Sequence, residues 1–396
     1  MPGYEMWGAE ERREVEEVLE TGILMRYGFD GARKGHWKAR ELEAALCQRT
    51  GAAHAQVVSS GTAALTTALA ALGVGAGDEV VMPTFTFVAS FEAVLSVGAT
   101  PVLADVDDTL TLSPAAARAA VGPRTRVVMP VHMCGAMADL GALDALCREK
   151  GIALLEDACQ ATGGTWQGRA LGSVGKAGCY SFDFVKTITC GEGGAVVTSD
   201  PDVARRCDQY ADHGHDHLGA DRGADLHPAL GYNFRISELH AAVGLAQLRK
   251  LDRFLEIQRR NKAALRSALA AVRGVTFRRI PDPAGDSASF LSFFLPDETR
   301  ARGAAKAMQA AGIPAMYWYD NNWHYVRRWD HLKSAASPNP LPASVRAVLA
   351  SLASRSFPAS DAVMSRAIST PIALGWSEQQ LHERASKLAA AVASVG

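Results

Sequence analysis

Lys186 lies in the glycine-rich segment Ser181-Phe182-Asp183-Phe184-Val185-Lys186-Thr187-Ile188-Thr189-Cys190-Gly191-Glu192-Gly193-Gly194, downstream of the acidic segment Glu156-Asp157-Ala158-Cys159-Gln160. The apolar run Ile152-Ala153-Leu154-Leu155 leads directly into the acidic segment, as a buried strand would. The sequence therefore predicts a carboxylate at the end of a buried strand and a lysine on a later turn.

This pairing of an acid with a lysine is what pyridoxal 5'-phosphate (PLP) chemistry requires. The amine of Lys186 can form a Schiff base with the cofactor aldehyde, and the carboxylate of Asp157 can pair with the pyridinium nitrogen. Taken alone, each residue has a simpler interpretation: a surface lysine beside a glycine loop, or an acid that caps a strand. The two together, with the phosphate motif that precedes them, favour the PLP interpretation.

A candidate phosphate site lies in Ser59-Ser60-Gly61-Thr62-Ala63-Ala64-Leu65. A strand that ends at Val58 and a helix that begins beside Thr62 would leave free backbone amides at a helix N-terminus, where an anion binds well. Gly61 would let the backbone approach the phosphate, and Ser181 could add a hydroxyl group. A Ser-Gly-Thr helix cap is common in α/β proteins, so this motif becomes specific only beside Lys186.

Composition excludes several classes of partner. The chain has 396 residues, with 41 basic against 42 acidic side chains, so it has no electrostatic footprint for nucleic acid or an anionic membrane. No apolar run is long enough to span a bilayer, and the N-terminal residues do not resemble a signal peptide. The seven cysteines lack metal-ligand spacing and indicate a reducing compartment. We therefore expect a cytoplasmic enzyme without metal.

Short apolar strands alternate with helical segments up to about residue 200, which predicts an α/β fold with a mainly parallel sheet between helices. The expected strands are 55–58, 79–82, 101–104, 127–131, 152–155 and 193–198, and the expected helices are 9–20, 37–49, 61–72, 85–97, 114–121 and 140–150. A long helical stretch follows over 236–273, with a hinge expected at 254–260. A strand at 290–294 and helices at 300–311 and 378–395 complete the chain. We expect a large PLP-binding domain, 1–250, with an N-terminal helical segment, and a smaller C-terminal α/β domain, 251–396.

These segments resemble the DegT/StrS-type sugar aminotransferases, which are fold-type I PLP enzymes, over nearly the whole chain. The resemblance also includes the segments 77–90, 101–107, 130–132 and 231–239. It implies that Phe87 stacks on the pyridine ring, that Gln160 lies beside the ring, and that Thr62 and Ser181 hold the phosphate. It further implies a homodimer with shared active sites, in which Asn233 reaches the phosphate of the neighbouring subunit.

Three stretches are similar to a branch of that family that aminates C8 of the acidic sugar 3-deoxy-octulosonate (Kdo). They are Asp183-Phe184-Val185, the loop His213-Gly214-His215-Asp216-His217, and Trp318-Tyr319-Asp320-Asn321-Asn322-Trp323-His324-Tyr325. The aromatic stretch, with Trp318 and Tyr319, could line a sugar site or could be a packing patch between domains. On a strand the three histidines would face one way, as metal ligands can, but the surrounding glycine and aspartate favour a loop. His213 and His215 are therefore candidate substrate-binding residues.

The resemblance implies transamination from an amino acid, by resemblance L-glutamate, to a keto or aldehyde sugar, with 8-oxo-Kdo giving 8-amino-Kdo as the specific expectation. Arg26 and Arg235 are candidates for binding a substrate carboxylate, because guanidinium binds it in a bidentate manner. The alternatives are a nucleotide-linked 4-keto or 3-keto sugar aminotransferase, a PLP-dependent sugar dehydratase, and a non-catalytic protein that keeps the fold. Dehydratases of this family replace the lysine with histidine, so Lys186 argues against that alternative.

Overall fold

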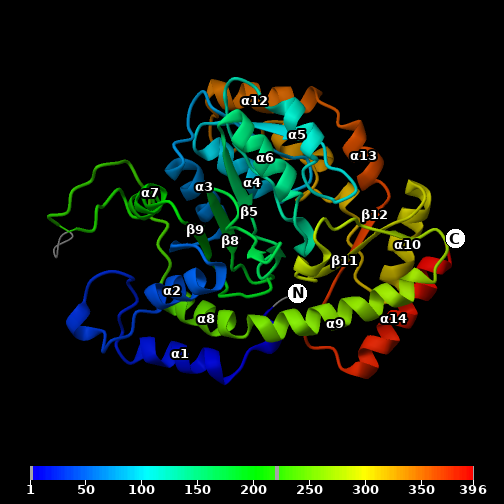
Figure 1. Ribbon diagram of the computed structural model, residues 1–396, viewed down its shortest axis with the longest axis horizontal. Helices are drawn as coiled ribbons and strands as arrows, with labels where there is room; N and C mark the ends of the chain where they lie inside the picture. Colours follow the sequence, from blue (N-terminus) through cyan, green and yellow to red (C-terminus); the bar gives the residue numbers. More distant parts are fainter. Residues whose placement is uncertain (1–2, 219–222, 396) are drawn as a thin grey trace.

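A seven-stranded sheet forms the centre of the computed structural model, which describes residues 3–218 and 223–395 (Figure 1). Its order is β1-β9-β8-β5-β4-β2-β3. The strands are β1 (His54–Val58), β2 (Glu79–Pro83), β3 (Thr100–Ala104), β4 (Thr125–Val128), β5 (Ala153–Asp157), β8 (Ala177–Ser181) and β9 (Gly194–Thr198). Within this sheet β9 runs antiparallel to both of its neighbours, and the remaining pairs are parallel. The expected mainly parallel α/β sheet is thus confirmed.

Both faces of this sheet are buried. Successive side chains on a strand point to opposite faces, so Val80 and Val127 enter one hydrophobic core while Val81 and Val128 enter the other. Helices cover both sides (Figure 1). They are α1 (Ala9–Leu19), α2 (Lys38–Thr50), α3 (Gly61–Ala71), α4 (Val88–Ser96), α5 (Pro114–Ala120), α6 (Leu140–Lys150), α7 (Pro201–Ala211) and α8 (Glu238–Arg249). Burial on both faces explains why these strands are apolar runs rather than alternating patterns.

A second, antiparallel sheet has the order β10-β11-β12. Its strands are β10 (Thr276–Phe277), β11 (Phe290–Phe294) and β12 (Ala367–Pro371), and it packs with α9 (Leu251–Ala270), α10 (Glu298–Ala310) and α14 (Glu378–Ala393) around a third core. A small hairpin joins β6 (Thr165–Trp166) to β7 (Arg169–Ala170). The remaining helices, α11 (Asp330–Lys333), α12 (Ala343–Ser354) and α13 (Pro358–Met364), come from the C-terminal part of the chain but pack on the core of the first sheet.

The predicted hinge at Phe254–Arg260 is wrong. Helix α9 runs through this segment without interruption, and Phe254 is fully buried in it. The segment contains neither glycine nor proline, so nothing breaks the helix there. The break falls instead at Lys250, between α8 and α9, which lie end to end in Figure 1. The division into domains 1–250 and 251–396 stays a prediction.

Helix α4 begins at Val88, three residues later than the sequence suggested. The preceding residues pair instead with a distant segment. The backbone amide of Thr86 donates to the carbonyl of His324 at 2.9 Å, and that of Val88 donates to the carbonyl of Trp323 at 2.8 Å. These bonds bring the 318–325 segment to the end of the central sheet. None of the helices in residues 3–218 and 223–395 has the length and apolar character needed to cross a bilayer.

Candidate active site

A cavity of about 230 Å³ lies where several strands of the central sheet end. Strands β1, β5 and β8 run in the same direction, so their carboxyl ends meet at one edge of the sheet, where open α/β sheets bind ligands. Eight predicted residues line this cavity: Ser60, Gly61, Thr62, Phe87, Asp157, Gln160, Ser181 and Lys186. The structure therefore brings together residues that lie far apart in the sequence.

Asp157, at the end of β5, is a buried carboxylate with hydrogen bonds but no cation. Its side chain is 2% exposed. Ser90 Oγ donates to its Oδ2 at 2.7 Å, and the amide of Cys159 donates to its Oδ1 at 3.1 Å. Among residues 3–218 and 223–395, no lysine, arginine or histidine forms an ion pair with it. A buried charge is costly unless it is paired, so this site suits a positively charged ring nitrogen.

The neighbouring Glu156 holds the end of β5 in place. Its buried carboxylate accepts hydrogen bonds from the amides of Gly172, Val174 and Gly175 at 2.7–2.8 Å, and its Oε2 lies 3.0 Å from His132 Nε2. The amide of Ala138 donates to His132 Nδ1, so Nε2 must carry the proton that is donated to Glu156. Asp157 therefore projects from a strand end whose neighbours are fixed by a fully satisfied polar network.

The N-terminus of α3 forms a cradle suited to a phosphate. Ser60 caps the helix: its Oγ accepts from the amide of Ala63 at 3.0 Å, which leaves its O–H group able to donate to an anion. In the part of the chain that the structure describes, the amides of Gly61 and Thr62 have no protein partner. A Cβ at Gly61 would lie 2.7 Å from Ser181 Cβ, so only glycine fits there. The phosphate of PLP fits such free amides and hydroxyls.

Lys186 lies on the turn that follows β8. Its amide donates to the carbonyl of Asp183 at 3.0 Å, and its own carbonyl accepts from the amide of Gly3 at 3.0 Å. The side chain is half-buried, and no acid among the described residues forms an ion pair with its Nζ. The sequence does not predict this strand, because Ala177-Gly178-Cys179-Tyr180-Ser181 lacks β-branched residues. Gly178 is required there, since a Cβ would lie 2.1 Å from the carbonyl oxygen of Gly172.

Aromatic residues border the cavity on the side of Phe87. The ring of Phe87 lies 5.6 Å from that of Trp323, nearly parallel, and 5.2 Å from that of His324. Gln160 is 9% exposed, and its Oε1 accepts from the amide of Cys134 at 3.3 Å. Ser90 and His324 also line the cavity but were not selected from the sequence. His324 belongs to the 318–325 stretch that could line a sugar site, but the contacts that bring it and Ser90 to this cavity come from distant segments.

The predicted substrate residues do not line this cavity, and their roles stay predictions. Arg26 is buried and donates to Glu43 at 2.8 Å and to the carbonyl of Val57 at 2.9 Å. Burial opposes the charge of Arg26, but Glu43 outweighs it and raises the pKa of the guanidinium. Trp318 is buried and donates through Nε1 to Ser369 Oγ at 2.9 Å, and Tyr319 is largely buried beside it.

Asn233 and Arg235 lie on a turn next to the histidine loop, also outside the cavity. The backbone of Asn233 bridges that of Asp212, and Arg235 pairs with the buried carboxylate of Asp212. His213 is exposed, whereas His215 is largely buried and lies 3.5 Å from Asp225. The three histidines lie on a loop, as the sequence indicated. Within residues 3–218 and 223–395, no group of three His, Cys, Asp or Glu side chains is arranged to hold a metal.

His217 binds two acids of this region. Its Nδ1 lies 2.6 Å from Asp208 Oδ2, and its Nε2 lies 2.9 Å from Asp212 Oδ2. Burial opposes protonation of the imidazole, but the two carboxylates outweigh it and raise the pKa of His217 to about 9. The ring also stacks on Tyr27 at 4.3 Å. His217 therefore acts as a cation that ties the loop to α7.

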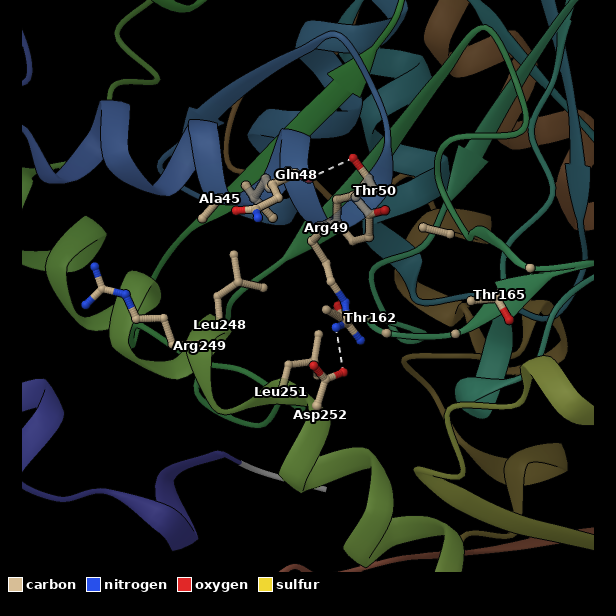
Figure 2. Close-up of a pocket in the computed structure, with 16 residues that line it drawn as sticks. Ala45, Gln48, Arg49, Thr50, Thr162, Thr165, Leu248, Arg249, Leu251 and Asp252 are labelled. Carbon is tan, nitrogen blue, oxygen red and sulfur yellow. Dashed lines mark hydrogen bonds and ion pairs between the residues drawn. The ribbon is translucent and has the colours of Figure 1, made fainter.

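A larger cavity, of about 500 Å³, lies between α2, the junction of α8 and α9, and the 162–170 turn (Figure 2). Figure 2 shows Arg49 and Asp252 pointing toward one another, with 2.5 Å between Nη1 and Oδ1. Neither Lys186 nor Asp157 lines it. Chemistry rather than size thus identifies the smaller cavity as the candidate active site.

Comparisons with known proteins agree with this site. A model of the DegT/DnrJ/EryC1/StrS aminotransferase family matches residues 6–388. The solved structure of 3-amino-5-hydroxybenzoic acid (AHBA) synthase is 33% identical, with a TM-score of 0.80, and the match covers 98% of this chain and 97% of that chain. DesV from S. venezuelae is 29% identical, with a TM-score of 0.79 and coverage of 97% and 94%. An aminotransferase from Psychrobacter cryohalolentis, at 24% identity and a TM-score of 0.85, covers 98% of both chains and shares the fold. The chain belongs to the DegT/DnrJ/EryC1/StrS aminotransferase family, a family of PLP-dependent sugar aminotransferases with the fold-type I architecture.

Proposed function

We propose that this enzyme binds PLP in the 230 Å³ cavity and moves an amino group from an amino acid, L-glutamate, to a keto or aldehyde sugar. The observation that carries the proposal is the joint presence in one cavity of Lys186 and the buried Asp157, to which the described residues supply no cation. A lysine amine and a carboxylate without a cation of its own are the two groups that PLP needs at opposite ends of its ring.

PLP, when bound, supplies an aldehyde and a ring that withdraws electrons. The chain's own residues then have separate roles. The carboxylate of Asp157 holds a proton on the ring nitrogen, and the amides of Gly61 and Thr62 with the hydroxyl of Ser181 bind the phosphate. The Nζ of Lys186 accepts the proton from the Cα of the amino donor and later returns one to the sugar carbon that is aminated. Phe87 covers a face of the cavity and excludes water.

An absorption experiment tests this proposal. The purified protein, loaded with PLP, should absorb in the visible range, and added L-glutamate should bleach that absorption while 2-oxoglutarate forms. A dehydratase would not convert glutamate to 2-oxoglutarate, and a non-catalytic protein would show no change. Failure to bind PLP at all would refute the proposed function.

We further propose a free acidic sugar, 8-oxo-Kdo, as the acceptor. The three sequence stretches shared with that branch support it. The 33%-identical structure also carries the name of a synthase whose product is a free carboxylic acid. No arginine is among the described residues that line the cavity, so a substrate carboxylate would need a cation from outside this lining.

The deciding assay compares 8-oxo-Kdo with UDP- and dTDP-linked 4-keto sugars under one donor. Faster amination of a nucleotide-linked sugar would reject 8-oxo-Kdo and favour the alternative acceptor.

The proposed assembly is a homodimer with shared active sites, located in the cytoplasm. Asn233 lies outside its own chain's cavity, which supports a role at the site of a second copy. In an isologous dimer both copies would make this contact symmetrically. The seven cysteines are free, which supports a reducing compartment in this proposal. Molar mass in solution tests the assembly, and a fully active monomer would refute it.

A further inference from the structure

His324 reaches the active-site cavity from a part of the chain far from Lys186 in sequence. Its carbonyl accepts from the amide of Thr86 at 2.9 Å, which fixes the backbone beside the cavity. Its ring lies 5.2 Å from that of Phe87 and 4.8 Å from that of Trp318. The imidazole is therefore held in one orientation by its backbone and by rings on two sides, and it lines the cavity with Lys186.

Hydrogen bonds to Asn321 determine which imidazole nitrogen carries the proton. The amide of Trp323, which can only donate, lies 2.9 Å from Asn321 Oδ1, so this atom is an acceptor. His324 Nδ1 lies 2.9 Å from the same oxygen and must therefore donate its N–H to it. In the neutral ring the other nitrogen, Nε2, then carries a lone pair. Among residues 3–218 and 223–395, no donor is recorded for Nε2.

The surroundings keep this ring neutral. Burial, and then the nearby charge of Lys186, lower the pKa of His324 to about 3. The other charged groups that line the same cavity are Asp157, Asp183 and Glu192, and none of them forms an ion pair with His324. The imidazole thus offers a neutral hydrogen-bond acceptor in the cavity that Lys186 also lines.

We propose that His324 Nε2 accepts a hydrogen bond from a hydroxyl group of the sugar acceptor and thereby positions the acceptor against Lys186. The inference rests on the proposed function and deepens it, because it requires an acceptor with a hydroxyl group near the carbon that is aminated. An amino-acid donor such as glutamate has no hydroxyl group to donate. His324 should therefore affect the second half-reaction more than the first.

The protonation of His324 can be measured without any turnover. Nitrogen-15 NMR of histidine-labelled protein, with the signal assigned through His324→Gln, should show a neutral ring protonated at Nδ1 throughout pH 6–8. Asn321→Asp keeps the shape but places a carboxylate beside Nδ1, so the same ring should become charged in that range and lose its acceptor. An Nε2-protonated or fully charged ring in the unmodified protein would overturn the inference.

Kinetics then test the role. We measure each half-reaction separately, the first with L-glutamate and the second with 8-oxo-Kdo and with dTDP-4-keto-6-deoxyglucose. His324→Phe should lower kcat/KM of the second half-reaction about tenfold more than that of the first, as expected when a buried hydroxyl loses its partner. His324→Gln should recover most of the loss, because its side-chain oxygen can also accept. Exposed His382→Gln is the control and should change neither half-reaction.

The outcomes separate this inference from the proposed function. If the unmodified enzyme aminates neither sugar with glutamate as donor, the proposed function fails whatever the histidine variants do. If it aminates one of them and His324→Phe lowers both half-reactions equally, or neither, then His324 does not position the acceptor. With Asn321→Asp, kcat/KM of the second half-reaction should fall as the pH is lowered. A profile identical to that of the unmodified enzyme would also overturn the inference.

Discussion

Replacement of Asp157 by asparagine tests the central assumption about the site. The change removes the charge but keeps the shape of a side chain that is 2% exposed. The hydrogen bond from the amide of Cys159, at 3.1 Å, can persist to the asparagine oxygen. In the unmodified protein Ser90 Oγ donates to Oδ2 at 2.7 Å. In the variant the Ser90 hydroxyl can rotate to accept from the NH₂ group instead, because Thr86 Oγ1, 2.7 Å from Ser90 Oγ, can either donate to it or accept from it. The fold should therefore survive.

The rate of the reaction should fall far more than the stability of the fold. A charged hydrogen bond contributes about 1.5–3 kcal/mol, which corresponds to about a 10- to 150-fold fall in rate if it is lost in the transition state. We expect the half-reaction with L-glutamate to slow by at least this factor, while the thermal midpoint of the protein without cofactor changes by only a few degrees. Stopped-flow absorbance measures the first quantity and calorimetry the second. The exposed Asp202→Asn is the control for loss of one carboxylate.

If the half-reaction rate of Asp157→Asn is within twofold of that of the unmodified enzyme, the reasoning is refuted. Such a rate would show that Asp157 does not hold the proton on the ring. A protein that fails to fold would be a different result, recognised by calorimetry. In that case Asp157→Glu, which keeps the charge but moves it by one methylene group, provides the comparison. Its rate should also fall, since the carboxylate would no longer meet the ring nitrogen in line.

Three further predictions follow from other parts of the structure. Lys186→Ala should abolish turnover and leave the fold intact, and borohydride reduction with peptide mapping should place the pyridoxyl group on Lys186; labelling of a different lysine would refute the assignment. Mixing inactive Lys186→Ala with inactive Asn233→Ala subunits should restore some activity, since one of the two sites in a mixed dimer is intact; no recovery in verified mixed dimers would contradict sharing. His217 should stabilise the fold most below pH 6.5 and lose this contribution as the pH rises through about 9, because its pKa is raised in the folded state. Unfolding free energies of the unmodified protein and His217→Gln should differ by about 1–3 kcal/mol at pH 6 and converge by pH 10.

Most of the cofactor site could be predicted from the sequence for a physical reason. Asp157 and Ser60 each lie two residues after the end of an apolar run, and the ends of parallel strands meet at one edge of a sheet. Once the strands were recognised, their neighbours in sequence became neighbours in space. The sequence does not predict the strand before Lys186, because close packing there requires small residues. Gly178 and Ala177 are poor strand formers in isolation.

The sequence offered the 318–325 stretch as a sugar site, but the place of His324 beside Lys186, like that of Ser90, could not be predicted because these contacts span long sequence distances. The position of His324 depends on one backbone hydrogen bond, from the amide of Thr86. That of Ser90 depends on a helix that begins later than its apolar pattern suggested. The partner of Arg26 was likewise invisible in the sequence. Glu43 on α2 forms an ion pair with Arg26 inside the fold, so this guanidinium is not available to a substrate. Local patterns show which residues end a strand, but not which charges neutralise each other.

The distribution of cations gives a physical reason for expecting a shared site. A donor such as glutamate brings carboxylates, and these need a guanidinium or an ammonium group. Among the described residues that line the cavity there is one lysine, Lys186, and no arginine. The amine of Lys186 is needed for the reaction, so it cannot bind the carboxylate as well. Arg26 is committed to Glu43. Arg235 lies on the same turn as Asn233, and although it pairs with Asp212, that acid is also bound by His217. His217 also pairs with Asp208, so the two acids balance the two cations, and Arg235 can bind a substrate carboxylate only in exchange for Asp212. If that turn reaches the cavity of a second copy, one contact supplies both the phosphate ligand and the missing cation.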